Sequence, residues 1–158
     1  MNDTKPAAIA ATSLPLRLGS GYPYPYSEPC DEREKRALGD AFGLLDYGVN
    51  LVTLPPGAWS SQRHWHSAED ELVYILEGRP TLVTDEGRTP MEPGMCAGFP
   101  ADSGNGHHLV NDSEEPVVYL EVGSRREEDD VDYPDIDMQI RGRGKGGEFE
   151  HKDGTRYA

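Results

Sequence analysis

The chain has 158 residues, the usual size of one domain, which predicts a single buried core with loosely held ends. Its 29 acidic residues outnumber its 15 basic ones, and the formal net charge of −14 would repel nucleic acid and anionic membrane surfaces. No apolar run approaches the roughly 20 residues that span a bilayer. We therefore expect a soluble protein with neither nucleic acid nor a membrane as its partner.

The chain begins with a segment, residues 1–29, that is typical of an arm outside the core. It is rich in Ala, Pro, Ser and Gly, and each Pro of Tyr22-Pro-Tyr-Pro-Tyr26 favours an extended backbone. Further on, Asp31 is followed three positions later by Glu34, which is the pattern of a helix start. We therefore expect a short helix over residues 31–38.

Two features of the sequence predict a cytoplasmic location. The early apolar run at residues 7–11 is too short for the apolar core of a secretion signal. The two cysteines, Cys30 and Cys96, lie far apart and lack the dense spacing of a disulfide framework. We expect Cys96 to be a buried or inert thiol.

From about Leu44 the residue pattern becomes that of short strands separated by turns. Turn residues recur at near-regular intervals, at positions 55–57, 77–78, 85–87, 92–94, 111–113 and 123. Many short strands at such a spacing indicate a β-sandwich or a β-barrel. We therefore predict an all-β domain over residues 30–125.

Residues 126–158 carry an acidic run followed by a glycine-rich basic stretch at 141–147, and neither has the pattern of a core element. We expect a solvated tail that packs lightly on the surface. A phosphate-binding loop is a weaker interpretation of the glycines, because no strand precedes them and the phosphate-loop spacing is absent. Blocks of acidic residues also bind partners, so a structural or regulatory role of this tail is a further hypothesis.

Four of the five histidines fall between positions 64 and 108, within the strand-rich region. His64 and His66 are two residues apart, so in a strand both imidazoles point to one face. Glu71 follows after a turn and can return a carboxylate beside them. His107 opens a later strand and is placed to supply a fourth ligand. The pattern indicates a metal centre.

Two segments resemble the two conserved motifs of the cupin superfamily. Residues 57–78 match the first motif, in which Gly leads to His-x-His, then Glu, then Gly; residues 94–111 match the second, in which Gly, Pro, Gly, His and Asn recur in order. Two turns differ, with six residues in place of five before the first histidine, and with Pro100 four residues before the next glycine. The resemblance implies a double-stranded β-helix barrel, jelly-roll-like, with a short N-terminal helix and extended terminal arms.

The resemblance also implies that four residues bind one divalent metal ion, His64, His66, Glu71 and His107. Three imidazoles and one carboxylate suit Mn, Fe, Ni, Co or Zn, and the sequence does not choose among them. Four protein ligands on an octahedral ion leave two positions for substrate or water. Ordinary polar histidines are disfavoured because all four ligands are present. Glu69 and Asp70 compete with Glu71, which alone has the motif spacing.

Alternation along the strand before His64 predicts which side chains surround the metal. Ser60 and Gln62 should point inward, which makes Gln62 a candidate substrate contact. Outward positions are expected for Ser61, Arg63, Trp65, Tyr74 and His108. Because small cupins resemble one another in forming homodimers, the apolar members of that outward set are expected to supply a dimer interface.

The resemblance implies a small-molecule ligand or substrate, and the first function hypothesis is a sugar-phosphate-isomerase-like enzyme acting on a small polar metabolite. The alternatives are an oxygen-dependent dioxygenase or lyase, and a non-catalytic cupin that binds a small ligand. An isomerase moves a proton between adjacent carbons, and a phosphosugar also needs cationic groups. Arg63, Arg79 and Arg88 are most simply surface charges. The lack of an evident inward Lys or Arg counts against a phosphosugar.

Overall fold

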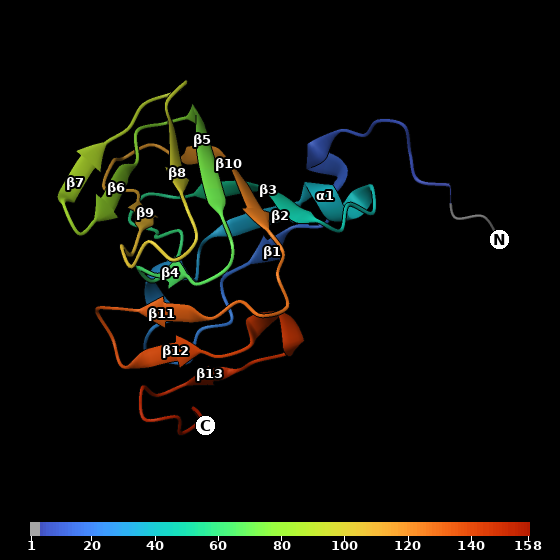
Figure 1. Cartoon of the computed structure of the whole chain (residues 1–158). Helices are drawn as coiled ribbons and strands as arrows, with labels where there is room; N and C mark the ends of the chain where they lie inside the picture. Colours follow the sequence, from blue (N-terminus) through green and yellow to red (C-terminus); the bar gives the residue numbers. More distant parts are fainter. Residues whose placement is uncertain (1–3) are drawn as a thin grey trace.

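The computed structural model describes residues 4–158. Within this range the chain is almost entirely β-structure, with one four-residue helix, α1 (Leu38–Ala41), and short 3-10 turns. No helix of the described part is long and apolar enough to cross a membrane. The strands in chain order (Figure 1) are β1 (Arg17–Leu18), β2 (Glu34–Ala37), β3 (Tyr47–Leu54), β4 (Trp65–His66), β5 (Glu71–Glu77), β6 (Thr81–Thr84), β7 (Gly87–Pro90), β8 (Cys96–Phe99), β9 (His108–Val110), β10 (Val117–Ser124), β11 (Val131–Tyr133), β12 (Met138–Ile140) and β13 (Phe149–Glu150).

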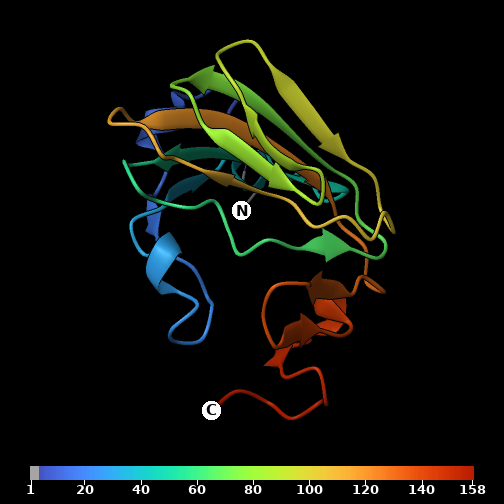
Figure 2. The same cartoon turned by 90° about the vertical axis from the view of Figure 1, so that its left-hand side faces the viewer.

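Two antiparallel sheets enclose the main core, as the layers of Figure 2 show. The larger has the strand order β1-β2-β3-β10-β5-β8, and the smaller has the order β7-β6-β9. Every second residue points inward, so Val52 and Leu54 of β3 are buried together with Val73 and Ile75 of β5, and Leu109 of β9 packs in the same cluster. This arrangement confirms the predicted all-β barrel with the character of a double-stranded β-helix.

The helix predicted over residues 31–38 is wrong. Half of that segment is β2, which pairs with β3 on one side and with β1 on the other. The helical residues come later, in α1. Pairing along the edge of β3 satisfies the backbone of the segment, and this outweighs a local capping pattern that contributes only about 1 kcal/mol.

The arm expected at residues 1–29 is held against the barrel from Arg17 onward. Arg17–Leu18 adds the edge strand β1 to the larger sheet. Cys30, which directly follows the predicted arm, is fully buried. The rings of Tyr22 and Tyr26 pack against a second apolar cluster that belongs to the C-terminal segment. The arm therefore contributes to the fold instead of lying outside it.

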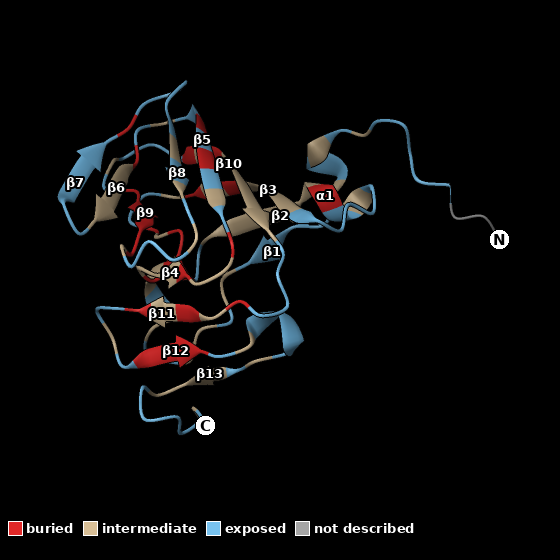
Figure 3. Ribbon diagram, in the orientation of Figure 1, coloured by how far each residue is buried: buried red, intermediate tan, exposed pale blue. Residues whose placement is uncertain are grey.

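The C-terminal segment is not the solvated tail that its composition predicted. It forms β11, β12 and β13, which join β4 in a four-stranded sheet beneath the barrel (Figure 1). Val131 and Tyr133 point to one face and pack with Met138 and Ile140 in a buried cluster, and β12 is buried along its whole length (Figure 3). Two of the apolar partners, Tyr22 and Tyr26, lie in the distant arm, so the segment alone does not contain the whole cluster. The division into arm, barrel and tail domains stays a prediction.

The outer face of the larger sheet is apolar and exposed. Leu72, Tyr74 and Leu76 of β5 are 43%, 41% and 40% exposed. Cys96 pairs with Tyr74 on the neighbouring strand and is also exposed, so the expectation of a buried thiol is wrong there, although both cysteines are free. Trp65 is half-buried, because β4 pairs with β11. The homodimer stays a prediction. Of the two residues expected at its interface, Tyr74 on the β5 face is more exposed than Trp65.

Arg63 fastens the C-terminal segment to the barrel instead of pointing into solvent. Its Nε donates to Asp135 Oδ2 at 2.8 Å and its Nη2 donates to Asp135 Oδ1 at 2.9 Å, a two-pronged ion pair. Its Nη1 donates to the Gly106 carbonyl at 3.1 Å and also contacts Asp85. One guanidinium therefore joins the barrel loops to the C-terminal segment.

Replacing Arg63 with Gln is expected to lower the free energy of unfolding by about 1 kcal/mol at neutral pH, since the Asp135 carboxylate is exposed to solvent although the Arg63 side chain is largely buried. The hydrogen bond from Arg63 holds the pKa of Asp135 below its usual value. The stabilisation is therefore present above the ordinary carboxyl pKa of about 4 and disappears as the pH falls below it. Urea unfolding of both proteins at about pH 7 and about pH 3 measures this difference. The same difference at both pH values would contradict the assignment.

Candidate metal centre

The four predicted ligands come together where β4, β5 and β9 meet. His66 lies in β4, Glu71 opens β5, and His64 and His107 directly precede β4 and β9. The backbones of His64 and His107 form a bridge, in which each N–H donates to the other residue's carbonyl, at 3.2 and 2.9 Å. This pairing fixes the histidine of the second motif beside those of the first.

The donor atoms of the four side chains converge. The distance from Glu71 Oε2 to His107 Nε2 is 2.6 Å and to His64 Nε2 is 3.5 Å, and Glu71 Oε1 lies 3.5 Å from His66 Nε2. Ligand atoms of His64, His66 and Glu71 all lie within 4.8 Å of one another. Glu71 Oε2 is buried, and among residues 4–158 it has no partner with hydrogen-bond geometry. Lone pairs that meet in this way fit a divalent cation.

The opposite ring nitrogens of His64 and His66 are held by other groups, and the ring of His107 is held by stacking. His64 Nδ1 lies 2.8 Å from the Gln62 carbonyl, and His66 Nδ1 lies 2.6 Å from Asp129 Oδ2. An Nδ1–H that donates to oxygen directs Nε2 toward Glu71, and a bound metal would displace any proton from Nε2. The His107 ring stacks on Phe99 at 3.6 Å between ring centroids, with the planes 1° apart. Each imidazole is therefore oriented by its surroundings.

Asp129 belongs to the C-terminal segment and is fully buried. Its second oxygen, Oδ1, accepts a hydrogen bond from the Ala68 backbone N–H at 3.0 Å, within the turn between His66 and Glu71. A carboxylate behind a metal-binding histidine fixes its ring and raises its basicity. In the sequence Asp129 is one member of an acidic run, and nothing distinguished it from its neighbours.

Glu69 does not replace Glu71. Both side chains are largely buried. Glu69 Oε2, however, lies 3.7 Å from His66 Nδ1, on the side of the ring that faces Asp129. Glu69 also accepts hydrogen bonds from the Arg126 backbone N–H at 2.9 Å and from Arg143 Nη1 at 3.1 Å. Glu69 therefore lies behind His66, whereas Glu71 lies among the three imidazoles, as the motif spacing predicted.

The protonation preferences of the ligands follow from burial and from their mutual contacts. Burial alone would raise the pKa of Glu71, but the imidazoles of His107, His64 and His66 hold that pKa well below its usual value. Burial alone would lower the pKa of His66, whereas its contacts with Asp129 and Glu71 outweigh burial and raise that pKa to about 9. Burial lowers the pKa of His107. Glu71 is therefore anionic, as a metal ligand must be.

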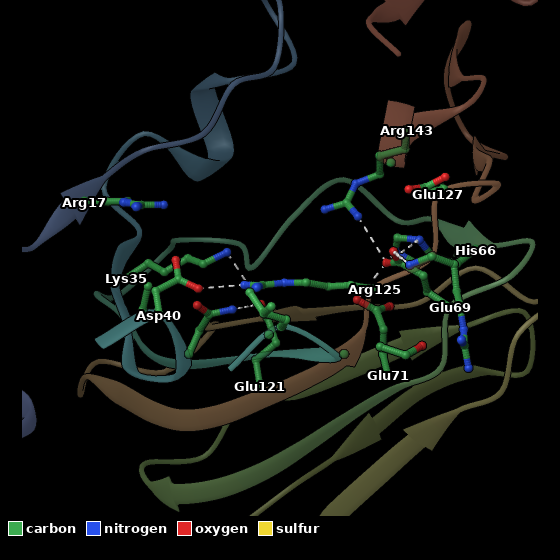
Figure 4. A pocket seen from close by; sticks show the side chains of 18 residues that line it. Arg17, Lys35, Asp40, His66, Glu69, Glu71, Glu121, Arg125, Glu127 and Arg143 are labelled. Carbon is green, nitrogen blue, oxygen red and sulfur yellow. Dashed lines mark hydrogen bonds and ion pairs between the residues drawn. The ribbon is translucent and has the colours of Figure 1, made fainter. Parts of the chain in front are cut away.

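A polar cavity of about 630 Å³ opens beside the metal ligands, with His66 and Glu71 in its wall. Figure 4 shows Arg143 above it and Arg17 and Lys35 at the end opposite His66. The sequence-based expectation that no Lys or Arg points inward is therefore wrong. These three cations come from the arm, β2 and the C-terminal segment, which are distant from the ligands in the sequence.

Comparisons with known proteins match this architecture. A family model described as a cupin domain matches residues 50–123. A crystal structure from Silicibacter pomeroyi, described as a sugar phosphate isomerase from a cupin superfamily, is 43% identical, with a TM-score of 0.90 over 96% of each chain. This chain belongs to the cupin superfamily. A second structure, from Acidithiobacillus ferrooxidans, carries the provisional description sugar phosphate isomerase; it is 33% identical, with a TM-score of 0.72 over 80% of this cupin and 81% of that chain. A search of the curated proteins found no match.

The side chains next to the ligands of this cupin differ from the alternation that the sequence predicted. Gln62 is buried, but its Nε2 donates to the Tyr26 carbonyl at 2.7 Å, so it holds the arm instead of facing the cavities. Ser61, expected outside, lines two smaller cavities beside the ligands, with Oγ 3.3 Å from His64 Nδ1. The reason is local: residues 60–63 form a series of bends, not a strand.

His108 is also inside the barrel of this cupin and does not face outward. It is 7% exposed, and its Nδ1 lies 2.7 Å from the Ser61 carbonyl. Its ring meets Trp59 edge to face at 4.9 Å between centroids. Burial lowers the pKa of His108 to about 4, so the ring is neutral near pH 7. His108 therefore packs behind the ligands as a neutral core residue.

Proposed function

We propose that this cupin is a metal-dependent enzyme that isomerises a sugar phosphate. The observation that carries the proposal is the convergence of three imidazoles on a buried carboxylate, at the wall of a polar cavity. The likeness to two structures described as sugar phosphate isomerases supports the reaction type. Cationic side chains line the cavity, which supports an anionic substrate. The expected lack of an inward Lys or Arg therefore no longer counts against a phosphosugar.

The donor set suits Mn, Fe, Ni, Co or Zn. A divalent ion bound there would act as a Lewis acid that polarises the carbonyl group of the sugar. The chain itself has to bind the substrate, exclude competing water and move a proton between adjacent carbons.

Glu121 of β10 is our candidate for the proton-transferring base. Two carboxylates, Glu71 and Glu121, line the main cavity and both smaller cavities beside the ligands. Glu121 lies two residues before Gly123, which pairs with Glu71, so both carboxylates stand on the same face of the sheet. Asn50 Nδ2 donates to Glu121 Oε1 at 3.1 Å. The other carboxylate oxygen, Glu121 Oε2, is then available to contact a substrate.

Elemental analysis of the untagged protein tests the metal centre. About one equivalent of a first-row divalent metal is expected in the wild type, and it should be lost in His64→Ala and in His107→Ala, because each change removes one of four ligands. His151→Ala is the matched control, since His151 contacts Asp137 at the surface of the C-terminal segment. A metal-free wild type, even after reconstitution, would reject the enzyme and leave a non-catalytic binding barrel.

The reaction itself is tested by incubating the metal-loaded protein with aldose phosphates in heavy water. Isomerisation through proton transfer places solvent deuterium on the carbon next to the carbonyl, and proton NMR detects this exchange whichever product forms. The exchange should proceed equally well without oxygen. A requirement for oxygen would favour the dioxygenase alternative.

The cytoplasmic location also remains a proposal. Cys30 and Cys96 are both free thiols, which is the usual state of cysteine in a reducing compartment.

A further inference from the structure

Basic side chains are concentrated around the main cavity of this acidic protein. Five of its 15 Lys and Arg residues line that one space: Arg17, Lys35, Arg125, Arg126 and Arg143. The same lining holds five acidic residues, Asp40, Glu69, Glu71, Glu121 and Glu127. An anionic ligand is therefore favoured only where a cation has no close acidic partner.

Two of these cations already have close partners. Arg125 Nη2 donates to Asp40 at 2.7 Å, and Arg143 Nη1 donates to Glu69 at 3.1 Å. Lys35 Nζ has only a loose contact, 3.7 Å from Glu121. The Arg17 guanidinium makes no hydrogen bond or ion pair within residues 4–158. Within residues 4–158, Arg17, Lys35 and Arg126 therefore lack a close side-chain partner, and of these three Arg17 and Lys35 lie on paired strands.

These two cations face each other across a strand pair. Arg17 of β1 and Lys35 of β2 are direct antiparallel partners, so their side chains project side by side from one face of the sheet. Like charges in directly opposed positions destabilise a sheet. An anion held between the two side chains would remove that repulsion, and a doubly charged phosphate would match two cations.

The same face of the sheet carries the metal ligand Glu71. Lys35 pairs with Val52, which pairs with Tyr119 of β10. Gly123 follows four residues later on that face and pairs with Glu71. Three strand spacings separate β2 from β5, about 14 Å between backbones. Figure 4 shows Arg17 and Lys35 at one end of the cavity and His66 and Glu71 at the other.

We propose that Arg17 and Lys35 bind the phosphate group of the substrate, while its carbon chain reaches back across the cavity to the metal ligands. Gly48 and Gly123 are cross-strand partners that line the cavity between the two ends, so this part of its floor carries no side chains. The assignment of the other end of the ligand rests on the proposed function. The phosphate subsite itself rests on the charges and the register of β1 and β2.

Calorimetric titration of the full-length, metal-free protein with inorganic phosphate tests the subsite, because removal of the metal excludes phosphate binding to it. Arg17→Gln and Lys35→Gln should each weaken phosphate binding about tenfold, since each removes one charge-assisted contact. Arg79→Gln should bind phosphate as the wild type does, because Arg79 forms an exposed pair with Glu92, outside the cavity lining.

Three results would overturn the phosphate subsite: no phosphate binding at millimolar concentration, binding unchanged in both cavity variants, or equal binding of acetate. The proposed function fails separately. Phosphate binding that depends on Arg17 and Lys35 supports the subsite. If the same protein binds no metal and catalyses no deuterium exchange, the isomerase is rejected and the subsite stands. If metal content and deuterium exchange are as expected but phosphate affinity is the same in the wild type and both cavity variants, the subsite alone is rejected.

Discussion

Glu121→Gln is expected to lower kcat for deuterium exchange and isomerisation by about 10²- to 10⁴-fold, the usual contribution of a positioned general base. Gln has nearly the same shape and retains an oxygen that can accept the hydrogen bond from Asn50. It cannot take up a proton from carbon. The metal content should be unchanged, because Glu121 lies two residues from Gly123 and is not one of the four converging ligands.

The split between kcat and KM separates the base from a purely binding role. Loss of a contact that merely helps Lys35 hold the phosphate would raise KM, whereas loss of the base lowers kcat at saturating substrate. Glu77→Gln, an exposed acid at the end of β5, is the matched control and should behave as the wild type. Undiminished deuterium exchange in Glu121→Gln would exclude Glu121 as the base.

Asp129→Asn is expected to weaken metal affinity about 10- to 100-fold without removing any ligand. In the wild type the buried carboxylate lies 2.6 Å from His66 Nδ1 and fixes both the tautomer and the direction of the ring. The neutral amide of Asn supplies no negative charge, and its NH₂ group can turn toward the ring. His66 would then be a weaker and less well oriented ligand.

Competition with a chromogenic chelator measures this loss of affinity, and urea unfolding of the metal-free proteins shows whether the C-terminal segment still packs. Asp132→Asn is the matched control, because Asp132 lies on β11 and pairs with Arg141 near the surface. If Asp129→Asn binds the metal as tightly as the wild type does, the carboxylate serves only to attach the segment.

The sequence sufficed to predict that His64, His66 and Glu71 come together, because their convergence depends on local geometry. His64 and His66 are two residues apart, and a single turn returns Glu71 to them, so strand periodicity alone brings three ligands together. The fourth, His107, required the motif resemblance. The barrel was also predictable, since inward residues such as Val52 and Ile75 alternate with exposed ones.

The parts that could not be predicted all depend on contacts between distant segments. Asp129 reaches His66 across 63 positions of the chain. The cluster around Tyr133 is completed by Tyr22 from the arm, and neither segment alone has enough apolar residues to indicate a core. Lys35 faces the cavity because β2 pairs with β3, whereas the local capping pattern favoured a helix. Gln62 was misplaced because strand alternation does not apply to a series of bends.

The position of Asp129 in the chain affects when the metal centre matures during synthesis. The four ligands are complete once His107 has left the ribosome, and the barrel strands are complete at β10. The carboxylate that orients His66 comes later, and it is held in place by β11 and β12, which are translated later still. A chain that has been made only through β10 therefore has all four predicted ligands but lacks the carboxylate that orients His66, and we expect it to bind a metal less tightly than the chain that includes β12.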